Sequence, residues 1–129
     1  EPSVIATNLN AGKGLVFEQY GTTYRAWKEP LYIVLLAWLT RWVGERDVVV
    51  MLFQSVFGIG VAMGIALIAW RLLGDRRKAM VAGVLAAANP FLVYYDTRFI
   101  HPISLDVLLF VTVVGTILLM TDRTRQTRP

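Results

Sequence analysis

Apolar residues fall into long uninterrupted runs, and the longest covers residues 48–70 without one ionisable side chain. About 20 apolar residues, at a helical rise of about 1.5 Å each, cross the roughly 30 Å hydrocarbon core of a bilayer. Only a helix lets such a segment satisfy its own backbone hydrogen bonds there. Four basic residues follow within residues 71–78. The pattern therefore predicts a transmembrane helix over residues 48–73 with a basic anchor at its end.

Two further apolar segments are long enough to span. Residues 79–95 are uncharged, and residues 99–121 are interrupted only by His101 and Asp106. Each has the length that a crossing helix needs. The predicted fold class is therefore an all-α integral membrane protein with three transmembrane helices.

The distribution of basic residues predicts the orientation. The connection at residues 71–78 carries a net charge of +3, and the tail at residues 122–129 a net charge of +2. These two segments are two crossings apart and hence on one side, which the positive-inside rule makes cytoplasmic. A short turn at residues 96–98 and a loop at residues 44–47 are then external. We expect an integral protein of a plasma or inner membrane with its C-terminus in the cytoplasm.

A shorter apolar segment lies at residues 31–43. Its 13 residues include Arg41, so it is marginal for a full crossing. We predict a juxtamembrane interfacial helix over residues 31–44, on the external face. The alternative, a short crossing helix, would require bilayer thinning and would place residues 1–30 in the cytoplasm.

The N-terminal 30 residues are too polar to enter lipid. Their three acidic and three basic side chains cancel. We predict an external arm over residues 1–30, with a short amphipathic helix at residues 3–9 and an irregular or extended stretch at residues 15–24.

Composition supports the membrane class, with 56% hydrophobic and 17% charged residues. The sequence pI is about 9.8, but the basic residues flank apolar helices, where they set topology. We therefore expect no nucleic-acid partner. The chain has no cysteine, which excludes a disulfide or a thiolate metal site within it. No phosphate loop, nucleophile elbow or pair of histidines at helical spacing is present, so no cofactor or metal is predicted.

Small residues at helical spacing predict a helix-packing face. Gly60 and Gly64 are four residues apart within the longest apolar run. Such pairs let another helix approach closely, either a helix of the same chain or one of another subunit. Because three helices make a thin bundle, we also expect other transmembrane helices or subunits as partners.

Polar residues near the last apolar segment form a candidate polar site. Asp106 lies within that segment, where an unpaired carboxylate costs about 2.5–3.5 kcal/mol. We expect it to face protein or water, with His101 and Arg98 nearby. The plainer interpretation is that Asp106 extends to the external surface.

Arg25 and Lys28 lie beside aromatic residues at the predicted membrane surface. A lysine presents a compact charge and three donors, which suit a lipid phosphate. Contact with ordinary headgroups, or pairing of Lys28 with Glu29, explains the pattern equally well. Trp27 and the pair at residues 94–95 are interpreted first as interfacial aromatic anchors.

The order of these motifs resembles the membrane glycosyltransferases of the C-type fold, in particular the protein mannosyltransferase-like and aminoarabinose transferase-like branch. The resemblance covers almost the whole chain. Its pieces are degenerate but moderately specific in order and spacing: Asn8-Leu9-Asn10-Ala11-Gly12-Lys13-Gly14, Trp27-Lys28-Glu29-Pro30-Leu31-Tyr32, Leu35-Leu36-Ala37-Trp38-Leu39, Trp70-Arg71-Leu72-Leu73-Gly74-Asp75-Arg76-Arg77, Ala86-Ala87-Ala88-Asn89-Pro90-Phe91 and Tyr94-Tyr95-Asp96-Thr97-Arg98.

The resemblance implies transfer of a sugar from a polyprenyl-phosphate donor to an acceptor on the outer face. Lys28 matches a basic residue of the family's donor-phosphate region, and Arg25 lies beside it. The family's catalytic carboxylate has no expected counterpart within these 129 residues.

Two hypotheses follow from this resemblance. In the first, the chain is a portion of a polyprenyl-phosphate-sugar-dependent membrane glycosyltransferase. In the second, it is a small non-catalytic transmembrane subunit that stabilises a larger membrane complex, such as an energy-transducing one. The chain is an enzyme only under the first hypothesis.

Overall fold

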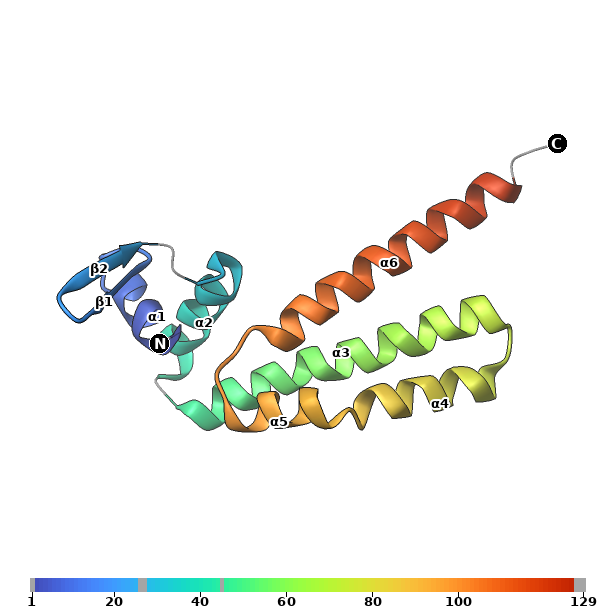
Figure 1. The fold of residues 1–129 in the computed structure, drawn as a ribbon, viewed down its shortest axis with the longest axis horizontal. Helices are drawn as coiled ribbons and strands as arrows, with labels where there is room; N and C mark the ends of the chain where they lie inside the picture. The colour runs from blue at the N-terminus through green and yellow to red at the C-terminus, as the bar shows by residue number, and fades with distance from the viewer. Residues whose placement is uncertain (1, 26–27, 45, 127–129) are drawn as a thin grey trace.

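The fold consists of an N-terminal unit followed by a bundle of apolar helices (Figure 1). The structure is a computed structural model that describes residues 2–25, 28–44 and 46–126. The N-terminal unit contains α1 (Pro2–Asn10), β1 (Val16–Gln19), β2 (Thr22–Arg25) and α2 (Pro30–Val43). The bundle contains α3 (Asp47–Leu73), α4 (Arg76–Ala87), α5 (Pro90–Arg98) and α6 (Ile103–Gln126). The predicted anchor Trp27 and tail residues 127–129 lie outside the described residues.

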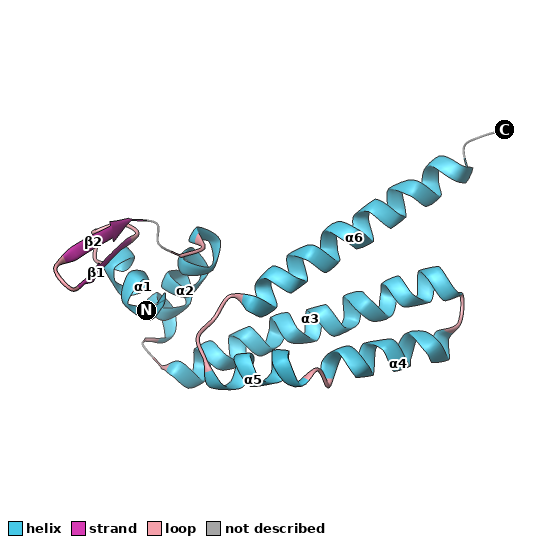
Figure 2. Cartoon of the chain, in the orientation of Figure 1, coloured by secondary structure: helices cyan, strands magenta, loops and turns pink. Residues whose placement is uncertain are grey.

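The N-terminal unit includes an antiparallel hairpin where the sequence indicated an irregular or extended stretch (Figure 2). Gln19 pairs with Thr22, so Tyr20 and Gly21 form a two-residue loop. Both loop residues have positive φ, 52° for Tyr20 and 76° for Gly21. A two-residue loop of this kind matches the twist of the paired strands. The hairpin is short, and the chain remains mostly helical.

The N-terminal unit has its own apolar core. Ile5, Phe17 and Ile33 from α1, β1 and α2 are buried in it, and Val50 and Leu105 of the bundle join the same cluster. Asn10 Nδ2 also donates to the Ala37 carbonyl, 2.9 Å away. The predicted arm and the predicted juxtamembrane helix therefore pack together, and their core is continuous with the start of the bundle.

Two helices, α3 and α6, are long and apolar enough to cross a membrane, over Asp47–Leu73 and Ile103–Thr121. A third crossing is available if α4 and α5 count as one span. By contrast α2 has only 14 residues. The chain is thus a mostly helical protein with two to three candidate membrane-spanning helices.

The predicted helix over residues 79–95 is not continuous. It is divided into α4 and α5, whose axes differ by 43°. Asn89 lies at the break, and its side chain accepts from the backbone N–H groups of Phe91 and Leu92. Pro90 then occupies the first position of α5, where its fixed φ suits a helix start. A capping residue followed by proline starts a new helix, which the apolar pattern alone did not reveal.

The predicted turn at residues 96–98 was also placed incorrectly. Asp96, Thr97 and Arg98 form the last turn of α5, and the connection to α6 is instead residues 99–102. Asp96 is buried, and Ser104 Oγ donates a hydrogen bond to its carboxylate. A Cβ at Gly58 would lie 2.8 Å from Asp96 Oδ2. The glycine in α3 therefore makes room for a carboxylate that the sequence suggested was external.

Glycines also set the helix contacts farther along α3. A Cβ at Gly60 would lie 3.0 Å from Leu108 Cδ1, and one at Gly64 would lie 2.5 Å from Val111 Cγ1. Both neighbours belong to α6, so Gly60 and Gly64 pack against a helix of the same chain. On the other side, a Cβ at Gly83 of α4 would lie 2.9 Å from Ala66 Cβ. Small residues therefore allow close approach on both sides of α3.

Candidate functional site

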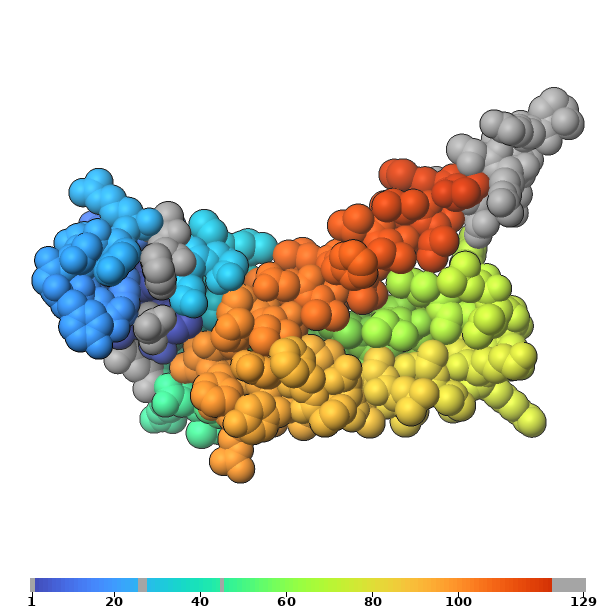
Figure 3. Space-filling model, viewed as in Figure 1, coloured from blue at the N-terminus to red at the C-terminus, as the bar shows by residue number. Residues whose placement is uncertain are grey.

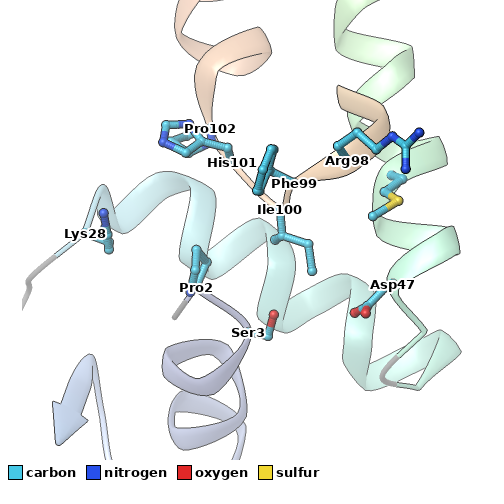
Figure 4. A pocket seen from close by; sticks show the side chains of 10 residues that line it. Pro2, Ser3, Lys28, Asp47, Arg98, Phe99, Ile100, His101 and Pro102 are labelled. Carbon is cyan, nitrogen blue, oxygen red and sulfur yellow. The ribbon is translucent and has the colours of Figure 1, made fainter. Parts of the chain in front are cut away.

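A cavity of about 420 Å³ lies where the N-terminal unit meets the start of the bundle (Figure 4). Its lining comes from α1, the segment before α2, the start of α3, the end of α5 and the connection to α6. The residues are Pro2, Ser3, Lys28, Asp47, Met51, Arg98, Phe99, Ile100, His101 and Pro102. The size is in the range of about 300–1,000 Å³ that is typical of small-molecule sites.

Three of the residues singled out from the sequence line this cavity together. Lys28 precedes α2, Arg98 ends α5, and His101 lies two residues before α6. In Figure 4 Lys28 and His101 lie on one side, while the Arg98 side chain extends away from them. Lys28 and His101 are half-buried and Arg98 is exposed. The cavity wall therefore carries two basic side chains and one imidazole.

The structure leaves the other two predicted polar residues outside the cavity lining. Arg25 is the exposed last residue of β2, and Asp106 is exposed in the first turn of α6. Asp47 is instead the acidic residue of the lining. The sequence placed Asp47 only in a loop before the first span, and its position at the start of α3 is what turns it toward the cavity.

A buried glutamine positions the segment that carries His101. Gln54 Oε1 accepts from the Tyr32 hydroxyl at 2.6 Å and from the His101 backbone N–H at 3.3 Å. Gln54 Nε2 donates to the Phe99 carbonyl at 2.9 Å. One side chain of α3 therefore holds α2 and the connection between α5 and α6. Gln54 is a strongly polar residue inside an apolar run, and this position in the sequence could have indicated a hydrogen-bonded contact between helices.

The protonation of Tyr32 supports this arrangement. Burial raises the pKa of the Tyr32 phenol, and the nearby negative charge of Asp96 acts in the same direction. The phenol is therefore protonated at neutral pH and can donate to Gln54. Tyr32 itself is almost fully buried, at 3% exposed.

The imidazole of His101 has unused hydrogen-bonding capacity. Its Nδ1 is buried and, within the part of the chain that the structure describes, has no hydrogen-bond partner. The ring lies 5.6 Å from that of Tyr95, centroid to centroid. A buried polar atom without a partner costs about 1–3 kcal/mol.

These groups suit an anion attached to an apolar chain. Lys28 and Arg98 are basic, Asp47 is the acidic residue of the lining, and His101 adds a polar ring on the same side as Lys28, so basic side chains outnumber acidic ones. Phe99, Ile100 and Met51 supply apolar surface. Over residues 2–25, 28–44 and 46–126, no group of three or more histidine, cysteine or acidic side chains could hold a metal ion.

No protein-family model, curated protein or solved structure matches the chain. The fold is mostly helical, and two to three of its helices are long and apolar enough to cross a membrane.

Proposed function

We propose that the chain binds a polyprenyl-phosphate-linked sugar as part of a membrane glycosyltransferase. The observation that carries the proposal is that Lys28 and His101 lie on one side of a cavity at an end of the apolar bundle, with Arg98 also part of its lining. Lys28 is far in sequence from Arg98 and His101, and a cavity lined by all three suits a ligand with an anionic head. The apolar helices beside them suit a ligand with a hydrocarbon tail.

In this proposal Lys28 holds the donor phosphate. Its ammonium group stabilises the charge that develops on the lipid phosphate as the bond to the sugar breaks. A carboxylate beyond these residues deprotonates the acceptor hydroxyl as a general base. His101 lines the same cavity and presents its ring beside the head of the donor. The resemblance noted from the sequence supports the same role for Lys28.

The direct test is binding of a polyprenyl phosphate to the purified protein in detergent micelles, with the unphosphorylated polyprenol as the reference probe. Lys28→Ala is compared with Lys13→Ala, which removes an exposed lysine that does not line the cavity. A charge-assisted hydrogen bond contributes about 1.5–3 kcal/mol, so we expect Lys28→Ala to weaken phosphate binding by roughly 10- to 100-fold. Polyprenol binding should not respond to either substitution.

Two results would contradict the proposal. One is equal binding of the phosphate and the polyprenol. The other is an equal effect of the two lysine substitutions. In an assembly that carries out sugar transfer, Lys28→Ala should also abolish transfer, and unchanged activity would remove the catalytic part of the proposal.

A second candidate function is a non-catalytic subunit of a larger membrane complex, and it rests on the uncovered face of α3. Five large apolar side chains follow one helical stripe and are each about 60% exposed, namely Leu52, Val56, Ile59, Met63 and Leu67. Such a stripe can face either lipid or a helix of another subunit. A photo-crosslinking residue at position 59, activated in native membranes, distinguishes the two. A discrete protein adduct supports the subunit, whereas adducts with lipid alone contradict it.

A further inference from the structure

A second hollow lies at the other end of the bundle, between α3 and α6. The two helices touch at Gly60 and Gly64, and α6 then diverges from α3 toward its C-terminal end (Figures 1 and 3). The divergence opens a groove of about 400 Å³. It narrows at the glycines and widens toward Trp70 and Arg71, which are also part of its lining.

The walls of this groove are suited to a hydrocarbon chain. Leu67, Ile68, Leu118 and Leu119 face it from the two helices. Its hydroxyl groups already have partners, because Thr112 Oγ1 donates to the Leu108 carbonyl and Thr116 Oγ1 to the Thr112 carbonyl, both at 2.8 Å. The groove therefore presents apolar surface, and its hydroxyl groups do not need a hydrogen bond from a ligand.

Basic residues lie at the wide end of the groove. Arg71 lines it directly, and Arg76 lines a neighbouring hollow of about 530 Å³ between α3 and α4. Leu67 and Trp70 line both hollows, so the two are adjacent. Arg77 and Lys78 follow in the first turn of α4, and Lys78 Nζ lies 3.9 Å from Asp75 Oδ2. Residues 71–78 thus keep a net positive charge beside the opening of the groove.

We propose that the groove between α3 and α6 binds an anionic phospholipid, with one acyl chain along the groove and the phosphate at Arg71. Basic pockets between transmembrane helices commonly bind anionic headgroups. The positive-inside rule predicts that this end is cytoplasmic, where anionic lipids are concentrated. This proposal concerns the opposite end of the bundle from the cavity at Lys28 and does not depend on the function proposed above.

Size and charge favour a lipid over a helix of a second copy. A transmembrane helix is about 10–12 Å across with its side chains, too wide for a groove that narrows to the glycine contacts. Two copies in one membrane would also have the same orientation. Pairing them through this face would bring Arg71 of each copy to the same depth, where like charges repel.

The experiment is native mass spectrometry of the purified protein in detergent, titrated with phosphatidylglycerol or with phosphatidylcholine of identical acyl chains. Arg71→Gln is compared with Arg46→Gln, which removes an exposed arginine at the opposite end of α3. We expect phosphatidylglycerol to bind at least fivefold more tightly than phosphatidylcholine. Arg71→Gln should weaken phosphatidylglycerol about fivefold, as expected for about 1 kcal/mol per cation, and Arg46→Gln should not.

A second variant tests the groove itself. A Cβ at Gly115 would lie 3.9 Å from Ile68 Cδ1, so Gly115→Leu can enter the groove without a backbone clash. We expect it to weaken both lipids by a similar factor. The control is Val113→Leu, at a position of α6 that is 56% exposed and outside the groove.

Three results would overturn the proposal. The first is equal binding of the two lipids to the unsubstituted protein. The second is the same loss from Arg71→Gln and Arg46→Gln, which would indicate only a general charge effect. The third is a dimer that Gly115→Leu dissociates, which would assign the groove to a second copy.

Discussion

Gln54 offers the sharpest test of how the two parts of the protein are joined. Its side chain is 1% exposed and bonds to three partners from other elements. Gln54→Leu keeps a similar side-chain size but removes every one of these bonds. The substitution should therefore loosen α2 and the connection that carries His101 from α3.

The magnitude follows from the number of bonds. Hydrogen bonds between transmembrane helices average about 0.6 kcal/mol and reach about 1.7 kcal/mol. Three of them give an expected loss of about 2–5 kcal/mol for Gln54→Leu. Tyr32→Phe removes one bond and leaves the Gln54 oxygen with the His101 N–H, so its expected loss is about 0.6–1.7 kcal/mol.

The assay is equilibrium unfolding in mixed micelles of mild detergent and dodecyl sulfate, followed by tryptophan fluorescence. Gln19→Leu serves as the matched control, because Gln19 is an exposed residue at the end of β1. The thermal midpoint of each variant provides a second measurement. The double variant Tyr32→Phe with Gln54→Leu should lose no more than Gln54→Leu alone, because the phenol that would lack a partner is absent.

Either of two observations would refute this reasoning. If Gln54→Leu and Gln19→Leu had equal effects, the hydrogen bonds of Gln54 would contribute nothing. If the losses from Tyr32→Phe and Gln54→Leu were additive, the two side chains would not be coupled.

Three further changes in the bundle should lower stability in the same unfolding assay. Gly83→Val places its Cβ 2.9 Å from Ala66 Cβ. We expect overpacking to lower the free energy of unfolding by about 1–3 kcal/mol. An unchanged midpoint would mean that α3 and α4 are not in close contact. Asn89→Ala removes the cap of α5 and should destabilise by about 1 kcal/mol, whereas Asn89→Asp should retain most of the stability. Ser104→Ala removes the hydroxyl that donates a hydrogen bond to the buried Asp96. We expect the free energy of unfolding to fall by about 1–3 kcal/mol, and Ser104→Thr should restore part of it.

The membrane character of the chain followed from local sequence. An uncharged run that is long enough to span must form a helix, since no other partner for its backbone is available in lipid. The run at residues 48–70 predicted α3, and the run at residues 99–121 predicted most of α6. In the structure α6 starts at Ile103, directly after Pro102, because proline disfavours a helical conformation in the residue before it.

Hydropathy predicted one helix where a helix cap and a proline produce two. Asn89 and Pro90 divide the segment at residues 79–95 into α4 and α5, although every residue in it is uncharged. Hydropathy measures whether a segment tolerates lipid and is insensitive to a change of helix axis. The cap and the proline were visible in the sequence, but only the structure shows that they bend the chain by 43°.

Tertiary packing alone decided the candidate site. The sequence named Arg25, Lys28, Arg98, His101 and Asp106 as candidates, and the structure groups only three of them around one cavity. It also buries Asp96 against Ser104, in place of an exposed turn. Periodicity and hydropathy describe how one segment meets its solvent, whereas the distance between residues 28 and 101 depends on how α2, α3 and α5 pack. Gln54 and the glycines of α3 set that packing, and their effect on distant side chains can be seen only once the helices are assembled.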